Sequence, residues 1–566
     1  MVKCLINEGI TKVFGIPGGQ LTPFIDAIVR VGESQGLEYV LTRHEAACAN
    51  MADAWFRVSG SIASCAGTIG PGASNMVAGM EAAMSDNIPL LAITPQIHTS
   101  RSYPFKGSMQ QLDQVTLYRP LTKWNALVNR WDRIPELVST AVRQALSGKT
   151  GPVHLDIPVD IMFETHDEDS VRLVAPEKSR STGRPQGDPD LIEKAAEMLA
   201  RAEKPLIHAG YGIMVSEAWE ELKELAEYLV CPVAPTTVAK GIIPEDHPLC
   251  LLPANGGMLT AAGGADVVLS IGCTFSELDC WGGPPFWSSP DVQKVIQVEI
   301  DPARIALNRE VDVGIVGDAR SVLRQLIQAV SGLTKKVEER QFTEDVQELE
   351  QMVRMGIDDA IENDDVPIHP LRLVKEVSEF FGSDAICSLD GGNVALWGAM
   401  GVRTNRPRSF LWPAGSGHLG TGLPFALGAK MAAPDRPVYV LHGDGAFLFS
   451  VMELETAARL NLPVVDIVAN DRSFAMIKGA QDTTYDKRYC GVDFTDVRID
   501  KIAEAMDCFG RRVSEPAEIK PALTEAVESG RPAVLDVMID CEVNMDPPTF
   551  STINDIWLMG CEGCTL

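Results

Sequence analysis

The sequence predicts an α/β protein composed of three doubly wound parallel-sheet domains. The chain has 566 residues, which suits three units of roughly 150 residues each. Short apolar runs with few alternating polar positions recur between stretches of helix length, and such runs are typical of parallel strands buried on both faces. Two polar segments divide the pattern into three blocks of similar size, so alternating strands and helices are expected in each block.

The first block, residues 1–165, is predicted to form an N-terminal domain. The polar segment after it, residues 166–189, has the composition of a linker. The predicted strands of this block are Lys12–Phe14, Glu38–Leu41, Ile62–Cys65, Pro89–Ile93 and Val153–Ile157.

The second block, residues 190–335, and the third, residues 368–545, repeat the same rhythm. The acid-rich stretch between them, residues 338–365, is predicted to form a solvated helix. A tail, residues 546–566, carries Cys561 and Cys564, which lack a second ligand pair for a metal site. The predicted strands are Pro205–His208, Ala265–Ser270 and Val295–Ile300 in the second block, and Ala385–Ser388, Val438–Leu441, Val464–Val468 and Ala533–Val537 in the third.

The composition restricts partners and compartment. The net charge of -28 comes from 77 acidic and 49 basic residues, so nucleic acid and anionic membranes are not expected as partners. A phosphorylated ligand is expected to bind through a divalent cation. The 13 cysteines are scattered and the 9 histidines lack zinc-binding spacing. No apolar run approaches the roughly 18 residues of a membrane span, and no cationic, apolar leader begins the sequence, so a cytoplasmic protein is expected.

The most specific chemical motif lies in the third block. The predicted strand Val438–Leu441 runs into Gly443–Ala446, and Asp471 follows the next predicted strand, 27 positions after Asp444. Both loops then lie at the carboxyl edge of adjacent parallel strands, where such sheets bind ligands. Two carboxylates beside glycines that admit a diphosphate are suited to holding hydrated Mg²⁺. A tight turn with a capping aspartate is the alternative for the first loop alone, and the spacing of the two loops favours the metal site.

A second motif, Arg43–Ala47, follows the predicted strand Glu38–Leu41 and begins a helix. Thr42 and Glu45 have the S/T-x-x-E spacing of a capping box, in which the acid lies at the helix N-terminus. The spacing alone favours this interpretation.

A third motif, Gly415–Gly420, matches G-x-G-x-x-G, and Asp444 follows it at a strand end. This combination makes an NAD-dependent oxidoreductase the alternative from a different functional class. The preceding residues, Ser409–Pro413, form a poor first strand because a proline interrupts them. Asp444 also lies between two glycines. Both departures count against a dinucleotide site.

The run from Leu427 to Ala446, followed by Asp471, resembles the signature of thiamine diphosphate enzymes. Arg43–Ala47 is similar to the catalytic glutamate motif of the same enzymes. The likeness to acetolactate synthases extends over nearly the whole chain, and the chain is also similar to benzaldehyde lyases. The resemblance implies that the three blocks are the pyrimidine-binding, central and diphosphate-binding domains. Three further segments resemble the acetolactate synthases in the same order: Phe14–Gln20, Gly70–Asn75 and Ser108–Gln111.

The resemblance implies a catalytic set in the first block. Glu45 would share a proton with N1′ of the aminopyrimidine ring, which prepares C2 of the cofactor to act as a nucleophile. Gln110 and Gly19 complete the predicted catalytic residues. Pro17, Gly18, Glu45 and Asn75 are predicted to contact the cofactor from this block.

The resemblance also implies a cofactor and metal set in the third block. Mg²⁺, or Ca²⁺, would be held by Asp444, Asp471 and the backbone carbonyl of Ser473, although the family usually has asparagine at position 471. The Gly417 carbonyl would accept from the 4′-amino group, and Leu419 would lie beneath the cofactor. The remaining predicted contacts are Asn393, Gly443, Gly445, Ala446, Phe474, Ala475 and Met476.

The implied reaction is decarboxylation of a 2-keto acid followed by carboligation. Cleavage of an acyloin, as in benzaldehyde lyases, is the alternative, and Gly18–Gln20 with Gln110 match the decarboxylating enzymes better. Leu278 stands where acetolactate synthases place an arginine for the carboxylate of the second 2-keto acid, and Ala480 replaces a tryptophan. A leucine cannot make a charge-assisted contact, so a different acceptor is expected.

Family members complete each site across a subunit interface. A homodimer is therefore the smallest assembly that could be active, and the expected assembly is a homotetramer. Some relatives hold FAD in the central domain. Here Gly210–Gly212 is only a G-x-G, and the segments around Asn255 and Leu278 are altered, so FAD is not expected.

Overall fold

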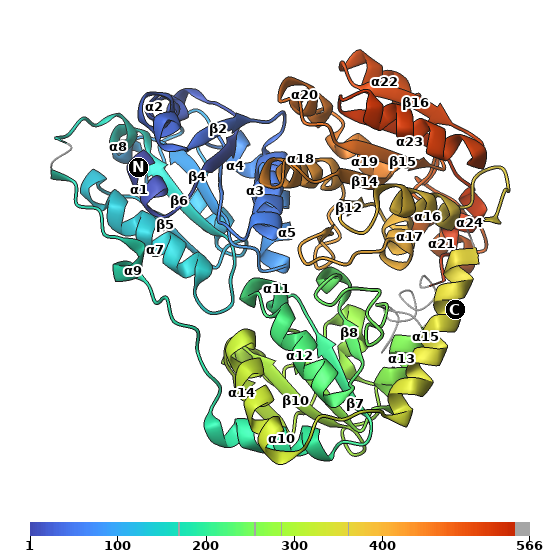
Figure 1. Ribbon diagram of the computed structural model, residues 1–566. Coiled ribbons are helices and arrows are strands. Elements are labelled where there is room, and N and C mark those ends of the chain that lie inside the picture. Colours follow the sequence, from blue (N-terminus) through green and yellow to red (C-terminus); the bar gives the residue numbers. More distant parts are fainter. Residues whose placement is uncertain (168–169, 254–255, 285, 360–361, 549–566) are drawn as a thin grey trace.

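The computed structural model describes residues 1–167, 170–253, 256–284, 286–359 and 362–548 (Figure 1). It contains three parallel sheets, each covered by helices, and confirms the predicted fold class. Cys561, Cys564 and Asn255 lie outside the described residues. Within these ranges, no helix is long and apolar enough to cross a membrane.

The first sheet has the strand order β2-β1-β3-β4-β6-β5. Its strands are β1 Lys12–Gly15, β2 Glu38–Leu41, β3 Ser64–Ala66, β4 Leu91–Gln96, β5 Trp124–Leu127 and β6 Val153–Pro158. The helices around it are α1 Val2–Asn7, α2 Thr22–Ala27, α3 Glu45–Ser59, α4 Pro71–Asn75, α5 Val77–Ser85, α6 Gln114–Tyr118, α7 Ile134–Leu146 and α8 Val159–Phe163. The segment predicted to be a linker follows and contains one short helix, α9 Pro176–Ser179.

The central sheet has the order β8-β7-β9-β10-β11. Its strands are β7 Pro205–Ala209, β8 Val233–Pro235, β9 Val267–Ile271, β10 Lys294–Glu299 and β11 Val313–Val316, with helices α10 Pro189–Arg201, α11 Gly212–Ser216, α12 Trp219–Leu229, α13 Gly256–Gly264 and α14 Ala319–Leu333. The acid-rich stretch forms a helix, α15 Gln341–Asp359, which packs against α13. The expectation of a wholly solvated helix was wrong, because Val346, Glu350 and Ile357 are buried on one face.

The third sheet has the order β13-β12-β14-β15-β17-β16. Its strands are β12 Ile386–Asp390, β13 Phe410–Leu411, β14 Val438–Gly443, β15 Val465–Asn470, β16 Phe509–Val513 and β17 Ala533–Met538. The helices are α16 Pro370–Phe381, α17 Asn393–Gly401, α18 Gly422–Ala432, α19 Asp444–Ser450, α20 Glu453–Arg459, α21 Ala475–Thr484, α22 Ile499–Ala505, α23 Ile519–Glu528 and α24 Cys541–Met545.

In each sheet the strand order reverses between the first and third strands: at β1/β3, β7/β9 and β12/β14. A reversal of this kind opens a crevice beyond the carboxyl ends of the strands, because the two flanking connections leave in opposite directions. Three potential ligand sites follow from topology alone, one for each sheet.

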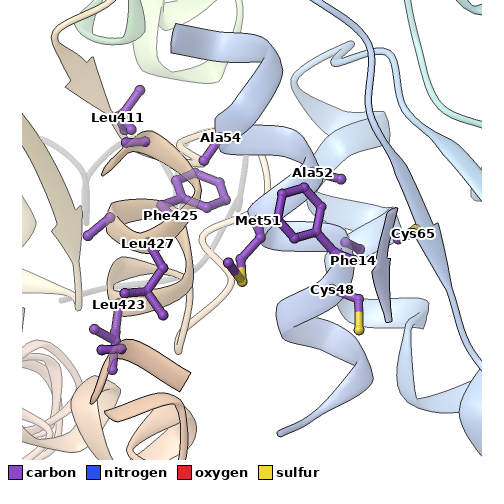
Figure 2. Close-up of a cluster of buried hydrophobic side chains, with 14 of the residues drawn as sticks. Phe14, Cys48, Met51, Ala52, Ala54, Cys65, Leu411, Leu423, Phe425 and Leu427 are labelled. Atoms are coloured by element: carbon purple, nitrogen blue, oxygen red, sulfur yellow. The ribbon is translucent and has the colours of Figure 1, made fainter. Parts of the chain in front are cut away.

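The N-terminal and C-terminal domains pack against each other through α3 and α18 (Figure 1). A single hydrophobic cluster contains buried side chains from both helices, and Figure 2 shows Met51 and Ala54 beside Phe425 and Leu427. The helices approach closely because Gly428 has no side chain: a Cβ there would lie 2.5 Å from the Met51 carbonyl oxygen. The two outer domains therefore share one core.

Candidate active site

A cavity of about 670 Å³ lies between the C-terminal and central domains, and Arg57 and residues 85–87 of the N-terminal domain also line it. Its wall in the C-terminal domain is formed beyond the carboxyl ends of β12, β14 and β15, which is the crevice that the topology predicts. The helices α17 and α21 both begin at this wall, and helix N-termini attract anions. The wall includes every site residue predicted for the third block: Asn393, Gly417, Leu419, Gly443, Asp444, Gly445, Ala446, Asp471, Ser473, Phe474, Ala475 and Met476.

Two buried aspartates are the chemical centre of this wall. Asp444 begins α19 directly after β14, and Asp471 follows β15. They are 5% and 7% exposed. Burial, and then the charge of Asp471, raises the pKa of Asp444 to about 8, while burial also raises the pKa of Asp471. Two carboxylates that oppose each other's ionisation in this way favour a cation between them.

The surroundings of the pair fit a divalent cation. Asp444 accepts from the Gly445 N–H at 2.9 Å, and Asp471 accepts from the Ser473 N–H at 2.9 Å. Among the described residues, no lysine or arginine forms an ion pair with either carboxylate, and no cluster of three acidic, histidine or cysteine side chains could hold a metal alone. Oxygen ligands from a bound diphosphate would complete the shell that Mg²⁺ requires. Nearby, Asn393 Oδ1 is buried without a hydrogen-bond partner, which leaves an acceptor for a ligand.

Asn544, on α24, joins this site and was not predicted from the sequence. Its Nδ2 donates to Asp471 Oδ2 at 2.7 Å, and its Oδ1 accepts from Trp397 Nε1 at 3.1 Å. The backbone carbonyl of Asn544 accepts from Asn393 Nδ2 at 2.5 Å. Asn544 therefore fixes the orientation of one predicted metal ligand. A polar residue shortly after the last strand of the sheet was the only available signal.

The site residues predicted in the first block form a separate group that does not line this cavity. Asn75 Nδ2 donates to Glu45 Oε2 at 3.0 Å, and Gln20 Nε2 donates to Gln110 Oε1 at 3.2 Å. Gly18 lies against Thr68, since a Cβ at Gly18 would be 2.3 Å from the Thr68 hydroxyl. The remaining members, Pro17 and Gly19, are exposed, as is Asn75. Within one chain, the predicted site residues thus form two separate groups. The group in the first block is called the N-terminal half-site, and the group that lines the cavity is called the C-terminal half-site.

The capping-box interpretation of Glu45 is wrong. Helix α3 begins at Glu45, and its N-cap is His44, whose Nδ1 accepts from the Ala46 N–H at 3.2 Å. Thr42 lies too far upstream to cap this helix, and its hydroxyl donates to the His44 carbonyl at 3.2 Å. The N–H groups of Arg43 and His44 donate to Glu453 of the C-terminal domain at 3.0 and 2.9 Å. The Glu45 carboxylate instead accepts from Asn75, so it takes no part in capping this helix.

The dinucleotide interpretation of Gly415–Gly420 does not suit the structure either. The segment connects β13 to α18, and β13 is a two-residue strand at the edge of its sheet. A dinucleotide-binding turn follows a strand at the switch point, not an edge strand. The Gly415 N–H donates to Asp86 at 3.0 Å, whereas Gly417 and Leu419 face the cavity.

The cavity continues into the central domain along Ser276–Asp279. Leu278 is 44% exposed on this wall, so an apolar side chain occupies the position where an arginine is expected in acetolactate synthases. Ala480 is not part of the wall. Arg57 also lines this part, but its guanidinium is held by Asp53 at 2.5 Å and Asp86 at 2.8 Å.

Comparison with known proteins agrees with this architecture. Three family models of thiamine pyrophosphate enzymes match the chain: the N-terminal TPP binding domain at residues 1–117, the central domain at 192–326 and the C-terminal TPP binding domain at 390–537. A probable acetolactate synthase large subunit of Methanococcus aeolicus is 36% identical, and the match covers 98% of this chain and 94% of that protein.

Two further relatives carry similar descriptions. The probable acetolactate synthase large subunit of Methanocaldococcus jannaschii is 37% identical over 95% of this chain and 91% of that protein. The acetolactate synthase isozyme 3 large subunit of Escherichia coli is 30% identical over 99% of this chain and 97% of that protein. These matches do not favour a lyase of the benzaldehyde lyase type, and the chain belongs to the acetolactate synthase-like family of thiamine pyrophosphate enzymes.

Proposed function

We propose that this protein is a thiamine diphosphate- and Mg²⁺-dependent carboligase, which decarboxylates a 2-keto acid and joins the remaining acyl unit to an acceptor that is not a second 2-keto acid. The observation that carries the proposal is the cavity that begins at Asp444 and Asp471 and ends at Leu278. One end suits a metal-bound diphosphate, and the described residues that line the other end offer no free cation for a carboxylate, since Arg57 is already paired with two aspartates. The names of the relatives support the first step of the reaction.

Asp444, Asp471 and the Ser473 carbonyl would hold the cation, and the starts of α17 and α21 would face the diphosphate. When bound there, thiamine diphosphate would supply the carbon nucleophile of the reaction. Glu45 would hold a proton at N1′ of the pyrimidine, supported by the hydrogen bond from Asn75. Gln110 would contact the substrate, with its side-chain carbonyl already fixed by Gln20.

A second copy of the chain would complete each site. Glu45 does not reach the cavity of its own chain, and Asn75 and Gly19 are exposed beside it. A closed dimer would bring each N-terminal half-site to the C-terminal half-site of the partner. A homodimer is thus the smallest active unit in this proposal, and a homotetramer is two such pairs.

Co-expression of two inactive chains tests this arrangement. When Glu45→Gln and Asp444→Ala chains are mixed, half of the dimers contain one of each, and one of their two sites is intact. Activity should return to about a quarter of the parent value. If both residues act within one chain, every site carries a defect and no activity returns.

We propose that the enzyme works without flavin. The part of the cavity wall that the central domain forms includes Asp279 and Glu277. Among the described residues that line the cavity, the one arginine, Arg57, is paired with two aspartates. A dinucleotide diphosphate would find no free guanidinium or ammonium on this wall in the part of the chain that the structure describes. A yellow purified protein with a flavin absorption spectrum would contradict this statement.

The substrate is tested by a screen of 2-keto acids as donors with aldehydes, ketones and 2-keto acids as acceptors. Evolution of CO₂ identifies the donor, and product analysis identifies the acceptor. The proposal expects efficient products with uncharged acceptors and poor formation of 2-aceto-2-hydroxybutyrate from pyruvate and 2-ketobutyrate. Efficient formation of that product at low substrate concentration would show that Leu278 does not decide acceptor choice.

A further inference from the structure

A network of fully buried polar side chains lies inside the N-terminal sheet. Asp156, on β6, is 0% exposed and accepts three hydrogen bonds: from Thr94 Oγ1 at 2.9 Å, Gln96 Nε2 at 2.8 Å and Gln114 Nε2 at 2.6 Å. All three donors are buried as well. Burying a carboxyl group among polar partners is costly unless each partner is satisfied, so such a network holds its members in one arrangement.

Gln114 connects this buried network to the backbone of Gly70. Its Oε1 accepts from the Gly70 N–H at 2.8 Å, while its Nε2 donates to Asp156 and to the Pro95 carbonyl. Gly70 has a φ of 70° and a ψ of -98°, a conformation suited to glycine, and immediately precedes α4. One amide group thus links the buried acid to the turn from which α4 begins.

The loop that carries Gln110 rests on the same turn. A Cβ at Gly70 would lie 2.4 Å from the Gln110 carbonyl oxygen, so the two backbones touch. A second tether, from Gln96 Nε2 to the Leu112 carbonyl at 3.1 Å, holds the loop just beyond Gln110. Gln110 itself has a φ of 63°. This strained conformation needs support from its surroundings.

Both proposed functional contacts of the N-terminal half-site therefore depend on one buried junction. Helix α4 ends in Asn75, which donates to Glu45, and the adjoining loop presents Gln110, which accepts from Gln20. We propose that Asp156 and Gln114 are positioning residues of the active site, which fix the Asn75 helix and the Gln110 loop relative to each other through Gly70. This inference rests on the proposed function, from which Asn75 and Gln110 take their roles.

A network that only stabilises the core is the competing explanation, and the pair at 2.6 Å allows the two to be separated. Gln114→Glu keeps the acceptor for the Gly70 N–H but places a second carboxyl oxygen opposite Asp156. Two such groups can share one proton, which bridges them at low pH and is lost as the pH rises. The geometry of the junction should therefore depend on pH more strongly in this variant than in the parent, where Asp156 is the one acid of the pair.

The other titratable groups around Asp156 do not supply this behaviour. His154, whose Nε2 lies 2.7 Å from Thr94 Oγ1, has its pKa lowered by burial to about 3 and stays neutral. Burial raises the pKa of Tyr118, which stacks on His154. Asp113, which accepts from Tyr103, adds a nearby negative charge that opposes ionisation of Asp156.

Steady-state kinetics of the holoenzyme with its best donor, well below the melting temperature, provide the test. For Gln114→Glu, kcat should be within about threefold of the parent near pH 6 and about tenfold or more lower near pH 8, because a small displacement of a positioned group slows catalysis strongly. Gln35→Glu adds the same charge at an exposed turn and should follow the parent at both pH values. A pH profile of Gln114→Glu that parallels the parent would overturn the proposal.

A second variant restores the hydrogen bond between positions 114 and 156 by exchanging donor and acceptor, while the Pro95 carbonyl loses its donor. In Gln114→Glu combined with Asp156→Asn, the new amide donates to the new carboxylate, and the Thr94 hydroxyl can turn to donate to His154. We expect kcat to return to within about threefold of the parent at both pH values. If Gln114→Glu alone does not fold, this double variant still decides the matter, because a folded double variant with kcat near the parent supports positioning and one with low kcat contradicts it.

Hydrogen exchange of the Gly70 amide separates this inference from the proposed function. In Gln114→Glu near pH 8, the Gly70 N–H should lose protection relative to the parent, because its acceptor moves. Unchanged protection would refute the positioning role whatever the activity. Lost protection with unchanged kcat would instead show that Asn75 and Gln110 do not have the roles assigned to them.

Discussion

The N-terminal and C-terminal domains have the same strand order but carry different chemistry at their switch points. In the C-terminal domain, the third and fourth strands, β14 and β15, are each followed by a buried aspartate. In the N-terminal domain, the corresponding strands, β3 and β4, are followed by Gly67 and Ile97, and the acid proposed to be catalytic, Glu45, comes after the edge strand β2.

The strand that comes last along the chain in each of these two sheets shows the same contrast. Asp156 on β6 and Asp536 on β17 occupy the same position in their strands, and both are buried. Asp156 has only neutral hydrogen-bond donors, whereas Asp536 is paired with Arg512 at 2.8 Å. Topology thus decides where a ligand can bind, while the residues just beyond each strand decide the charge and chemistry of that site.

The strongest test of the contrast is Asp444→Ala. We expect it to abolish Mg²⁺-dependent binding of thiamine diphosphate, because the diphosphate would then face Asp471 without a properly held cation. Tryptophan fluorescence titration with the cofactor and Mg²⁺ measures the affinity. Asp435→Ala, at an exposed position before the start of β14 and therefore at the opposite edge of the sheet, is the control and should bind as the parent does. Unchanged affinity in Asp444→Ala would move the metal site elsewhere.

Glu45→Gln should affect rate and spare binding, which is the opposite pattern. The variant keeps a hydrogen-bond acceptor for Asn75 but cannot exchange a proton with the pyrimidine ring. Hydrogen–deuterium exchange at C2 of the bound cofactor should slow by about 10²–10⁴-fold.

The exposed Glu33→Gln is the matched control for this change. Exchange in Glu45→Gln as fast as in the parent would remove Glu45 from the mechanism. A large loss of cofactor affinity in Glu45→Gln would contradict the expectation that the N-terminal domain contributes to rate and the C-terminal domain to binding.

Gly428→Val tests whether the two domains are one cooperative unit. The new side chain would meet the Met51 backbone, so α18 and α3 must separate, and the free energy of unfolding should fall by about 1–3 kcal/mol. Denaturant unfolding followed by both tryptophan fluorescence and circular dichroism is the measurement.

Gly332→Val, in α14 where a Cβ meets open space, controls for the loss of a helical glycine. Equal stability of the two variants would argue against tight packing of α3 on α18.

The last prediction concerns pH. Burial, as the main cause, raises the pKa of Asp156 to about 7, so the folded protein retains a proton that the unfolded chain has lost above about pH 4. The free energy of unfolding should therefore fall as the pH rises from about 4 to 7, by at most about 1.4 kcal/mol per pH unit from this group.

Asp156→Asn removes that contribution, and its unfolding free energy should fall less steeply with pH than that of the parent. The exposed Asp435→Asn should retain the parent slope. Parallel slopes for the parent and Asp156→Asn would contradict the shifted pKa.

The strands that the sequence did not predict are all at sheet edges: β5, β8, β11, β13 and β16. Interior parallel strands are buried on both faces and appear as continuous apolar runs, whereas β5 and β16 are mostly half-buried and lack that signal. The C-terminal half-site was accessible from sequence because its acids lie at fixed positions after neighbouring strands. Asn544 was not, because its contact with Asp471 spans 73 residues.

The position of Glu45 shows a second limit. Its local spacing favoured a helix cap, but the N–H groups just before the helix are taken by Glu453, a residue of another domain. A pattern confined to four residues cannot reveal a partner more than 400 residues away.

That partnership has a consequence for how the protein is made. Glu453, α18 and their half of the shared hydrophobic cluster leave the ribosome long after α3 does, since His44 and Glu453 are 409 residues apart. At roughly 5–20 residues per second, the apolar face of α3 would wait on the order of 20–80 s for its partner. During that interval the nascent N-terminal domain exposes a surface that chaperones recognise, and a truncated N-terminal domain produced alone should keep exposing it.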